Sequence, residues 1–559
     1  MKPAYLSISP SFPLLRTVRH GYYLVFLSLL SSVLFWLSWP PNRLTPLLLV
    51  ALVPLLCIER HVERYQYHQP YWTFYKYTYL TLFLWNLTTT WWVAHATVAG
   101  AVFMLFVNTF CMSLPLPLFQ FTSKHLGRCM GYLSLITYWV SMEHVHLQWE
   151  FSFPWLNLGN GFACRPEWVQ WYAYTGALGG TVWILVANLL LCYLLYSKNT
   201  TTRRRLGGMV SCWIMLPILC SYYTYLHYKE QGREVEVVVM QPNIDPYTGA
   251  FVNTEKVLSM EERIEHFIQL SETQLTAKTK FLVWPEIAID GLFDEKMLDV
   301  YPLVDRLISL KQLYPQLSVL AGLNSLVSYG NAKATKTARF SNRYGYYDVF
   351  NTALFVGNQG KLDTYHKSKL VPGVEIVPYL YSLDIPKILT PGSRGRLSSL
   401  GRQDHVSVFC NGKGVGIAPT ICYESVYGDY LTKFVRRGAS LIFSITIDGW
   451  WKNTPGYQQH FQYTRLRAIE SRRSIARSAL KGISAFINQR GDILKATQYE
   501  DHAAMRCTLQ ANPTLTFYVQ HSGYVANTAL WTAFFLTIGA TLSKIFTKNM
   551  QKRRAFPTT

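Results

Sequence analysis

Charged residues are scarce in this chain of 559 residues. Only 15% of them are Asp, Glu, Lys or Arg, whereas soluble globular proteins average roughly 25%. Half of the residues are hydrophobic, and they are clustered in long runs. This composition argues against an ordinary soluble protein and predicts an integral membrane protein that also carries a soluble domain.

Acidic residues are fewer than basic ones. The chain has 32 Asp and Glu against 53 Lys and Arg, which leaves a formal net charge of +21. A basic balance is also typical of nucleic-acid-binding proteins. Here, however, the basic clusters lie beside apolar spans, where they determine membrane topology; the clusters are residues 124–128, 203–205 and 548–554. We therefore expect no nucleic-acid partner.

Metal-binding patterns are missing as well. The ten cysteines include no Cys-x-x-Cys pair, and no paired histidines accompany them, so a structural zinc site is not expected. Five cysteines lie within apolar spans and are most simply small packing residues: Cys57, Cys111, Cys192, Cys212 and Cys220. No small-residue cleavage site follows the first apolar stretch, which predicts an uncleaved first helix rather than a signal peptide.

Eight apolar stretches are candidates to cross the roughly 30 Å hydrocarbon core of a bilayer. They are residues 22–39, 44–58, 72–92, 93–119, 131–143, 177–196, 207–225 and 524–546. Lys and Arg concentrate in the loops on one side, which predicts a cytoplasmic N-terminus and C-terminal tail. Seven crossings then bring residues 230–522 to the outer side of the membrane.

The sequence therefore divides into three predicted parts. Residues 1–229 form an N-terminal membrane domain with about seven transmembrane helices, and residues 523–559 form a C-terminal transmembrane helix with a basic cytoplasmic tail. Residues 230–522 alternate strand patterns with helical ones, for example a strand over 281–284, a strand over 441–446 and a helix over 457–479. This alternation predicts an α/β layered domain.

Three predicted strands of this α/β domain end next to a chemically useful side chain. Cys422 follows an apolar run, Glu286 follows Trp-Pro, and Lys367 follows a predicted hairpin strand. A thiol has an ordinary pKa near 8.5, so a lysine charge and a carboxylate base would be needed to activate it. The lysine and the backbone N–H of Tyr423 would then stabilise an oxyanion. Such a set supports acyl transfer without a metal or cofactor.

Each of these residues also has an ordinary structural interpretation. Cys422 fits a buried strand cysteine, Glu286 a surface carboxylate, and Lys367 a hairpin residue that aids solubility. Lys369 competes with Lys367, because two residues that lie two apart on a strand point to one face. The aromatic loop at 144–170 fits either an interfacial belt or the wall of a lipid cleft. Composition and spacing leave these alternatives open.

Three motifs around these residues favour the catalytic interpretation. Trp284-Pro285-Glu286, the segment from Lys367 to Glu375, and Ile421-Cys422-Tyr423-Glu424 resemble the signature segments of the nitrilase superfamily, in the expected order. With the run at 153–160 and the multispan N-terminal part, the whole chain resembles the apolipoprotein N-acyltransferase family, a membrane-bound branch of that superfamily. The resemblance implies a nitrilase-like αββα sandwich on an eight-helix platform in the bacterial inner membrane, with the active site in the periplasm.

The resemblance also implies a ping-pong reaction. Cys422 would take an acyl chain from a phospholipid, such as phosphatidylethanolamine, as a thioester. The chain would pass to the diacylglyceryl-modified N-terminal cysteine of an apolipoprotein, which is the last step of lipoprotein maturation. By position, Glu286 would be the base and Lys367 the electrostatic stabiliser. Further candidates for supporting the site or binding substrate are Asn351, Glu375, Tyr423, Glu424, Trp450 and Trp451.

Two segments depart from the family pattern. Ile447 precedes Asp448 where an Asn is usual, and Leu480-Lys481 stands where a small polar pair is usual. A missing buried amide would leave its partners unpaired, at a cost of roughly 1–3 kcal/mol. Two other functions therefore stay open from the sequence: a membrane-tethered amidase or hydrolase that uses water as acceptor, and a catalytically silent lipoprotein-binding protein.

Overall fold

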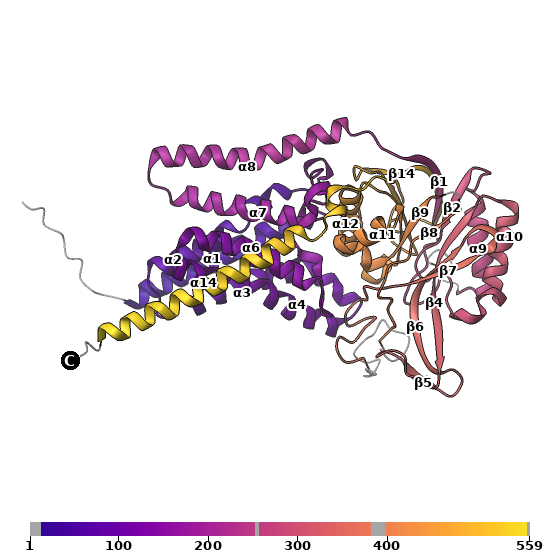
Figure 1. Cartoon of the computed structure of the whole chain (residues 1–559), viewed down its shortest axis with the longest axis horizontal. Coiled ribbons are helices and arrows are strands. Elements are labelled where there is room, and N and C mark those ends of the chain that lie inside the picture. Colours follow the sequence, from indigo (N-terminus) through magenta and orange to yellow (C-terminus); the bar gives the residue numbers. More distant parts are fainter. Residues whose placement is uncertain (1–12, 252–256, 382–398, 413, 556–559) are drawn as a thin grey trace, which may run out of the picture.

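The computed structural model describes residues 13–251, 257–381, 399–412 and 414–555 (Figure 1). Helices dominate the chain up to His227, and two β-sheets with their covering helices occupy the stretch from Arg233 to Ala511. The two parts lie end to end along the long axis of the molecule. The last long helix, α14 (Tyr524–Ala555), runs back along the helical part.

All eight predicted spans are helical. The helices are α1 (Pro13–Ser38), η1 (Thr45–Leu49) with α2 (Val53–Arg64), α3 (Pro70–Thr90), α4 (Val98–Ser113), α5 (Pro115–Leu126), α6 (Arg128–His146), α7 (Tyr172–Tyr196), α8 (Thr200–His227) and α14. Within the described residues, six helical stretches are long and apolar enough to cross a membrane: His20–Ser38, Thr45–Arg64, Val98–Leu126, Tyr172–Tyr196, Thr200–His227 and Tyr524–Gln551. The two predicted spans outside this set are α3, which buries Thr81 and Asn86, and α6, which buries Ser134 and Glu143.

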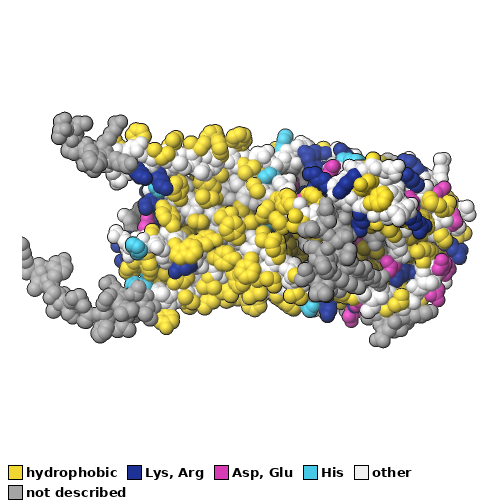
Figure 2. Space-filling model, turned by 90° about the horizontal axis from the view of Figure 1, so that it is seen from below, with side chains coloured by type: hydrophobic (Ala, Val, Ile, Leu, Met, Phe, Trp, Pro, Cys, Tyr) yellow, Lys and Arg dark blue, Asp and Glu magenta, His cyan; other side chains and the backbone are white. Residues whose placement is uncertain are grey.

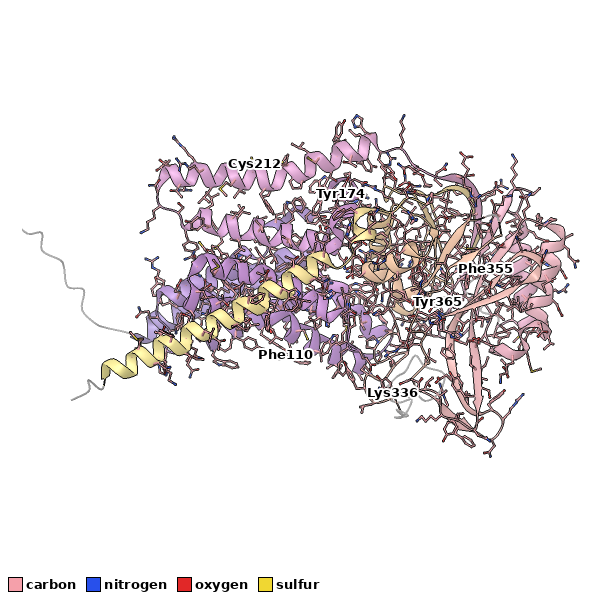
Figure 3. The ribbon with its side chains drawn as sticks, in the orientation of Figure 1. Phe110, Tyr174, Cys212, Lys336, Phe355 and Tyr365 are labelled. Atoms are coloured by element: carbon pink, nitrogen blue, oxygen red, sulfur yellow. The ribbon has the colours of Figure 1, made fainter. Side chains whose placement is uncertain are left out.

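The outer surface of the helical part is apolar. Exposed aromatic side chains line α4 at Phe103, Phe106 and Phe110, and Figure 3 shows Phe110 at the edge of the bundle. Figure 2 shows a broad hydrophobic band over one face of the helical part, while charged side chains gather at its end and on the α/β part. A soluble protein rarely exposes so large an apolar area, so this band is the lipid-facing surface of a membrane protein.

Two β-sheets form the centre of the α/β part. The first has the strand order β14-β1-β2-β4-β6-β5, with β3 beside β4 and β7 beside β6. Its strands are β1 (Arg233–Gln241), β2 (Thr279–Val283), β3 (Leu292–Asp294), β4 (Ser318–Gly330), β5 (Arg339–Ser341), β6 (Gly345–Val356), β7 (Leu362–His366) and β14 (Ala503–Ala511). The second has the order β13-β12-β11-β10-β9-β8. Its strands are β8 (Phe409–Cys410), β9 (Gly416–Ile421), β10 (Ala439–Thr446), β11 (Ser474–Ala479), β12 (Ala485–Ile487) and β13 (Ile493–Ala496).

Alternating side chains of β1 show how the layers form. Val237 and Val239 belong to the core between the sheets, whereas Val238 and Met240 face a second core under α9 (Met260–Glu272) and α10 (Pro302–Leu313). The sheets meet through contacts such as Phe281 against Phe443, with ring centroids 5.1 Å apart. Helices α11 (Gly428–Arg436) and α12 (Pro455–Ser471) cover the second sheet. The predicted αββα sandwich is confirmed.

The helix predicted over 457–479 is too long. Helix α12 ends at Ser471, because Arg472 adopts a left-handed conformation with φ of 51° and closes the last turn. The residues that follow form β11, which pairs with β10 in the interior of the second sheet. Alternating small and branched residues such as Ile475 and Ala476 therefore belong to a buried strand rather than to a helix.

Buried aromatic side chains join the helical part to the sandwich. The hydroxyl of Tyr463 on α12 donates to the carbonyl of Trp155 at 2.9 Å and accepts from the indole N–H of Trp39 at 2.9 Å. The indole of Trp155 donates to Gln459 at 2.7 Å. Trp155 is 1% exposed, so this part of the aromatic loop is not a free interfacial belt. Together with Phe151 and Phe153, Trp155 lines an apolar cavity beside α4, so the loop belongs both to the junction and to a cavity wall.

Substitution of Tyr463 tests this junction. Tyr463→Phe removes the hydroxyl and leaves a buried indole N–H and a buried carbonyl without their partner, at about 1–3 kcal/mol for each group. We expect the purified protein in detergent to melt several degrees below the parent, measured by tryptophan fluorescence. Tyr222→Phe is the control, because Tyr222 is 48% exposed on α8. An unchanged melting temperature for Tyr463→Phe would contradict the role of the junction.

Candidate active site

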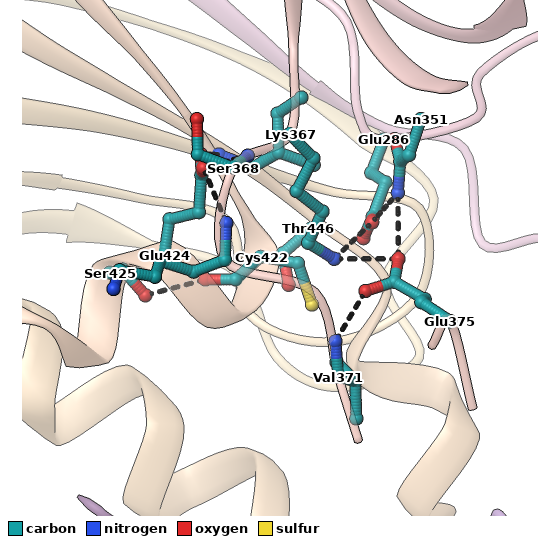
Figure 4. Close-up of polar contacts among 12 residues, drawn as sticks. Glu286, Asn351, Lys367, Ser368, Val371, Glu375, Cys422, Glu424, Ser425 and Thr446 are labelled. Atoms are coloured by element: carbon teal, nitrogen blue, oxygen red, sulfur yellow. Dashed lines mark hydrogen bonds and ion pairs between the residues drawn. The ribbon is translucent and has the colours of Figure 1, made fainter. Parts of the chain in front are cut away.

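Glu286, Lys367 and Cys422 line one buried chamber (Figure 4). Lys367 directly follows β7 and Cys422 directly follows β9, while Glu286 lies three residues beyond β2. The exposed fractions of the three residues are 3%, 1% and 8%. The ends of three strands from both sheets therefore bring a carboxylate, an ammonium group and a thiol into the same pocket.

The loop that carries Glu286 lies directly against β4. The N–H of Trp284 donates to Leu320, the N–H of Gly322 donates to Pro285, and the N–H of Ala288 donates back to Gly322. A Cβ at position 322 would lie 2.6 Å from the Cα of Glu286. Only glycine permits this close approach, so Gly322 helps to determine where the carboxylate points.

Lys367 is held between two carboxylates. Its Nζ lies 2.8 Å from Oε1 of Glu375 and 3.3 Å from Oε1 of Glu286. Asn351 on β6 bridges the same two carboxylates, since its side-chain amide donates to Glu286 at 2.7 Å and to Glu375 at 3.1 Å. The second oxygen of Glu375 accepts from the N–H of Val371. These contacts fix the positions of the Lys367 ammonium group and the two carboxylates relative to one another.

Burial and charge shift the pKa values in this chamber. Burial raises the pKa of Glu286, Lys367 opposes that shift, and Glu375 adds to it. Burial alone would lower the pKa of Lys367, but Glu375 and Glu286 outweigh it and raise that pKa. Burial and the charge of Glu286 raise the pKa of Cys422 to about 12, although Lys367 acts against them. At neutral pH, Cys422 is therefore a thiol rather than a thiolate.

Cys422 lies on a sharp turn, at the start of η9 (Cys422–Val426). Its φ of 51° is left-handed, which a residue with a side chain rarely adopts. The hydroxyl of Ser425 donates to the carbonyl of Cys422 at 2.8 Å, and Nε2 of His460 lies 3.2 Å from the same oxygen. Strained residues of this kind persist only where the surroundings hold them, and they are common at reactive sites.

A buried network of hydrogen bonds and ion pairs supports this turn through His460. Nδ1 of His460 lies 3.0 Å from Asp448, and Arg477 donates to both oxygens of Asp448 at 2.8 Å. All three side chains are fully buried. Burial would raise the pKa of Asp448, but Arg477 and His460 outweigh it and lower that pKa. Sequence reasoning missed His460, because a single histidine within a helix carries no signal of its distant partners.

Glu424 ties the cysteine loop to the lysine loop. One of its oxygens accepts from the hydroxyl of Tyr365 at 2.6 Å and from the N–H of Ser368 at 2.7 Å. The other accepts from the N–H of Ile421 at 2.9 Å. Burial raises the pKa of Glu424 to about 7. Its contacts fix the backbone beside Lys367 and Cys422.

The expectation that Lys367 and Lys369 share one face is wrong. Strand β7 ends at His366, so both lysines lie in the loop beyond it and strand alternation does not apply. The Nζ of Lys367 points to the two carboxylates, whereas the Nζ of Lys369 lies 5.1 Å from the ring centroid of Tyr427. Of the two lysines, Lys367 is the one that lines the chamber with Cys422.

A second cavity meets the chamber at Cys422. This apolar groove runs between α4 and the loop around Phe151, and Tyr423 lines it. Groove and chamber share seven lining residues, among them Cys422 and Trp451, whereas Trp450 lines only the chamber. The sulfur therefore stands where an apolar groove beside a membrane helix joins a chamber that carries charged groups.

The two departures from the family pattern lie side by side. Ile447 and Leu480 are both buried, both line the chamber, and both belong to the same apolar cluster. Leu480 keeps its backbone paired, because its N–H donates to Thr446 at 2.9 Å. Lys481 points to Asp245, at 3.8 Å. The chamber wall at Ile447 is therefore apolar where the pattern suggested a hydrogen-bonding amide.

Known proteins resemble this chain over most of its length. Residues 31–190 match the family model of the apolipoprotein N-acyltransferase N-terminal domain, and residues 237–510 match that of carbon-nitrogen hydrolases. The apolipoprotein N-acyltransferase of Chlorobaculum tepidum is 29% identical, over 93% of this chain and 97% of its own length. That of Geobacter metallireducens is 24% identical, over 89% and 92%. A crystal structure of a Helicobacter pylori carbon-nitrogen hydrolase aligns with 53% of this chain and 93% of its own, at 14% identity and a TM-score of 0.36.

The chamber predicts how the thiol of Cys422 titrates. Glu286→Gln removes a negative charge that raises the pKa of Cys422, so the thiolate should form at a lower pH than in the parent. The measurement is the rate of alkylation of Cys422 by iodoacetamide between about pH 7 and about pH 11, followed by peptide mass spectrometry.

Glu236→Gln is the matched control, because Glu236 lies on β1, outside the chamber, where it accepts from Thr279. This variant should alkylate like the parent at every pH. An alkylation profile that Glu286→Gln leaves unchanged would contradict the electrostatic link between Glu286 and the thiol.

Proposed function

This chain belongs to the apolipoprotein N-acyltransferase family, and we propose that it transfers an acyl chain from a phospholipid to the N-terminal diacylglyceryl-cysteine of apolipoproteins. One observation carries the proposal. The sulfur of Cys422 stands at the meeting point of the apolar groove and the chamber that contains Glu286 and Lys367. A fatty chain can lie in the apolar groove while its ester group lies in the chamber against Glu286 and Lys367.

In the first half-reaction, Cys422 attacks the ester carbonyl of the phospholipid. Its proton passes to Glu286 as the S–C bond forms, since the raised pKa of this carboxyl suits a general base. The ammonium group of Lys367 and the N–H of Tyr423 stabilise the oxyanion. The C–O bond then breaks, and the alcohol of the lysophospholipid leaves with the proton from Glu286. A thioester on Cys422 remains.

In the second half-reaction, the α-amine of the apolipoprotein's modified cysteine attacks the thioester. Glu286 accepts a proton from the amine, the N–C bond forms, and Lys367 again faces the oxyanion. The C–S bond breaks, and the departing sulfur recovers its proton from Glu286. The products are an amide and the free thiol, so the enzyme ends as it began. No metal or cofactor takes part in these steps.

The position of the groove suits lipid substrates. Its lining includes Phe103 of α4, which is 53% exposed on the lipid-facing side. A soluble enzyme would have to extract each acyl chain from the bilayer at about 0.8 kcal/mol per CH₂. A groove that opens beside a membrane helix avoids most of that cost, because the chain moves sideways from one apolar environment to another.

In this proposal, the chain spans the bacterial inner membrane and residues 230–522 face the periplasm. The basic clusters support this orientation. Arg128 at the start of α6 pairs with Glu59 and Glu63 of α2, so these two helix ends lie on one side. Three arginines follow the start of α8, which Figure 1 shows at the end of the bundle away from the sandwich. Residues 1–229 and 523–559 then form the membrane platform. Phosphatidylethanolamine, as an abundant phospholipid there, is the proposed donor.

Product analysis tests the proposal. The purified protein receives a phospholipid with a labelled acyl chain and a diacylglyceryl peptide, and we expect the label to appear as an amide on the peptide. Glu286→Gln should slow this transfer by about 10²–10⁴-fold, because it removes the general base. Cys422→Ser should abolish transfer, whereas Cys410→Ser, at an exposed cysteine, should not change it.

Other outcomes separate the competing functions. Release of labelled fatty acid without label on the peptide would replace the transferase with a hydrolase that uses water as acceptor. A protein that binds the diacylglyceryl peptide but turns over neither substrate would be a catalytically silent lipoprotein-binding protein.

A further inference from the structure

A basic pocket lies on the other side of the loop that carries Lys367. It encloses about 380 Å³ and is lined by Trp149, Lys369, Arg402, Tyr427, Tyr430 and Lys433, among others. Cys422 does not belong to its lining, whereas Ser152 lines both this pocket and the apolar groove. The hydroxyls of Tyr423 and Tyr427 both bond to Ser152, at 2.9 and 2.8 Å, and close the wall between the two cavities.

Two cations of this pocket share one aromatic ring. The Nζ atoms of Lys369 and Lys433 each lie 5.7 Å from the ring centroid of Tyr430. In the part of the chain that the structure describes, neither ammonium group has a carboxylate within 4.0 Å. Burial, together with the charge of Lys433, lowers the pKa of Lys369. Two like charges without such a carboxylate, one on the half-buried Lys369 and one on the exposed Lys433, favour an anionic ligand between them.

The charge of Arg402, the third cation of the pocket, is already paired with a carboxylate. Arg402 lies 3.3 Å from Glu150, which also accepts from the N–H of Tyr379 at 2.7 Å. Asp404, the other acidic residue of the lining, is exposed to solvent. The charge available to a ligand is therefore that of Lys369 and Lys433.

The pocket begins at the level of the membrane interface. Phe103 of α4 contacts Phe151, which contacts both Trp149 and Tyr379, with ring centroids 5.3–5.4 Å apart. Aromatic clusters of this kind mark the boundary between hydrocarbon and water. Trp149 belongs to this cluster and to the pocket lining. Figure 2 shows Lys and Arg side chains gathered just beyond the end of the hydrophobic band. Lipid phosphate groups lie at this level.

We propose that the basic pocket binds the phosphate group of a membrane phospholipid through Lys369 and Lys433. A phosphate diester carries one negative charge and strong acceptor oxygens, which match two ammonium groups with no carboxylate of their own. Lys369 lies in the loop that also carries Lys367, so a bound phosphate would hold that loop in place. The pocket is separate from the reacting sulfur, and the proposal does not depend on acyl transfer.

Lipid binding to the full chain tests the proposal. The protein carries Cys422→Ser so that no acyl transfer occurs, and calorimetry in detergent measures the affinity for dioctanoyl phosphatidylethanolamine. We expect the double variant Lys369→Met/Lys433→Met to bind this lipid at least about tenfold more weakly, because two charge-assisted contacts are lost. Its affinity for dioctanoylglycerol, which has no phosphate, should not change.

Matched controls identify the source of the phosphate. Lys278→Met/Lys361→Met removes the same charge from two exposed lysines and should bind the phospholipid like the parent. Competition by inorganic phosphate that is lost in the double variant would support a site for phosphate itself. Phospholipid binding that resists such competition but is lost in the double variant would support a site for lipid-borne phosphate. Equal phospholipid affinity of the parent and the Lys369→Met/Lys433→Met variant would overturn the proposal.

Discussion

The structure depends on one buried ammonium group between two carboxylates. Lys367 contacts Glu375 and Glu286; Lys367 and Glu286 are buried, and Glu375 is largely shielded from water. Desolvation makes such a cluster costly unless every charge is paired and hydrogen-bonded. Asn351 and the N–H of Val371 supply the further hydrogen bonds. Burial and the charge of Glu286 keep Cys422 neutral, while the charge of Lys367 acts against them. Burial also raises the pKa of Glu286, as the proposed role of this carboxylate as a base requires.

The membrane helices form part of the wall of this site in addition to holding the sandwich at the membrane. The apolar groove that reaches Cys422 is built from α4 and the loop around Phe151 as much as from the sandwich. The junction through Trp39, Trp155 and Tyr463 fixes the sandwich on the helices, and the groove lies beside it. A site of this kind requires both parts in one chain, because its apolar side belongs to the membrane and its charged side to the sandwich.

The sequence predicted the elements that local signals determine. Strand ends pointed to Glu286, Lys367 and Cys422, and the resemblance implied the αββα sandwich, which is confirmed; the catalytic roles of the three residues stay predictions. The structure revealed what tertiary contacts determine. His460 and Asp448 are twelve residues apart but meet Arg477 only in the folded sandwich. Lys367 and Lys369 were expected to share one face as strand residues, but both lie in the loop beyond β7, where strand alternation does not apply.

The central claim is that Cys422, beside Lys367 and Glu286, carries the acyl chain from lipid to protein. Intact-mass spectrometry of the protein after incubation with phospholipid, without any acceptor, tests it most directly. We expect a mass increase of one acyl chain that maps to Cys422, disappears with neutral hydroxylamine and is missing in Cys422→Ser. An unmodified protein, or an acyl group on another residue, would show that Cys422 does not carry the acyl chain.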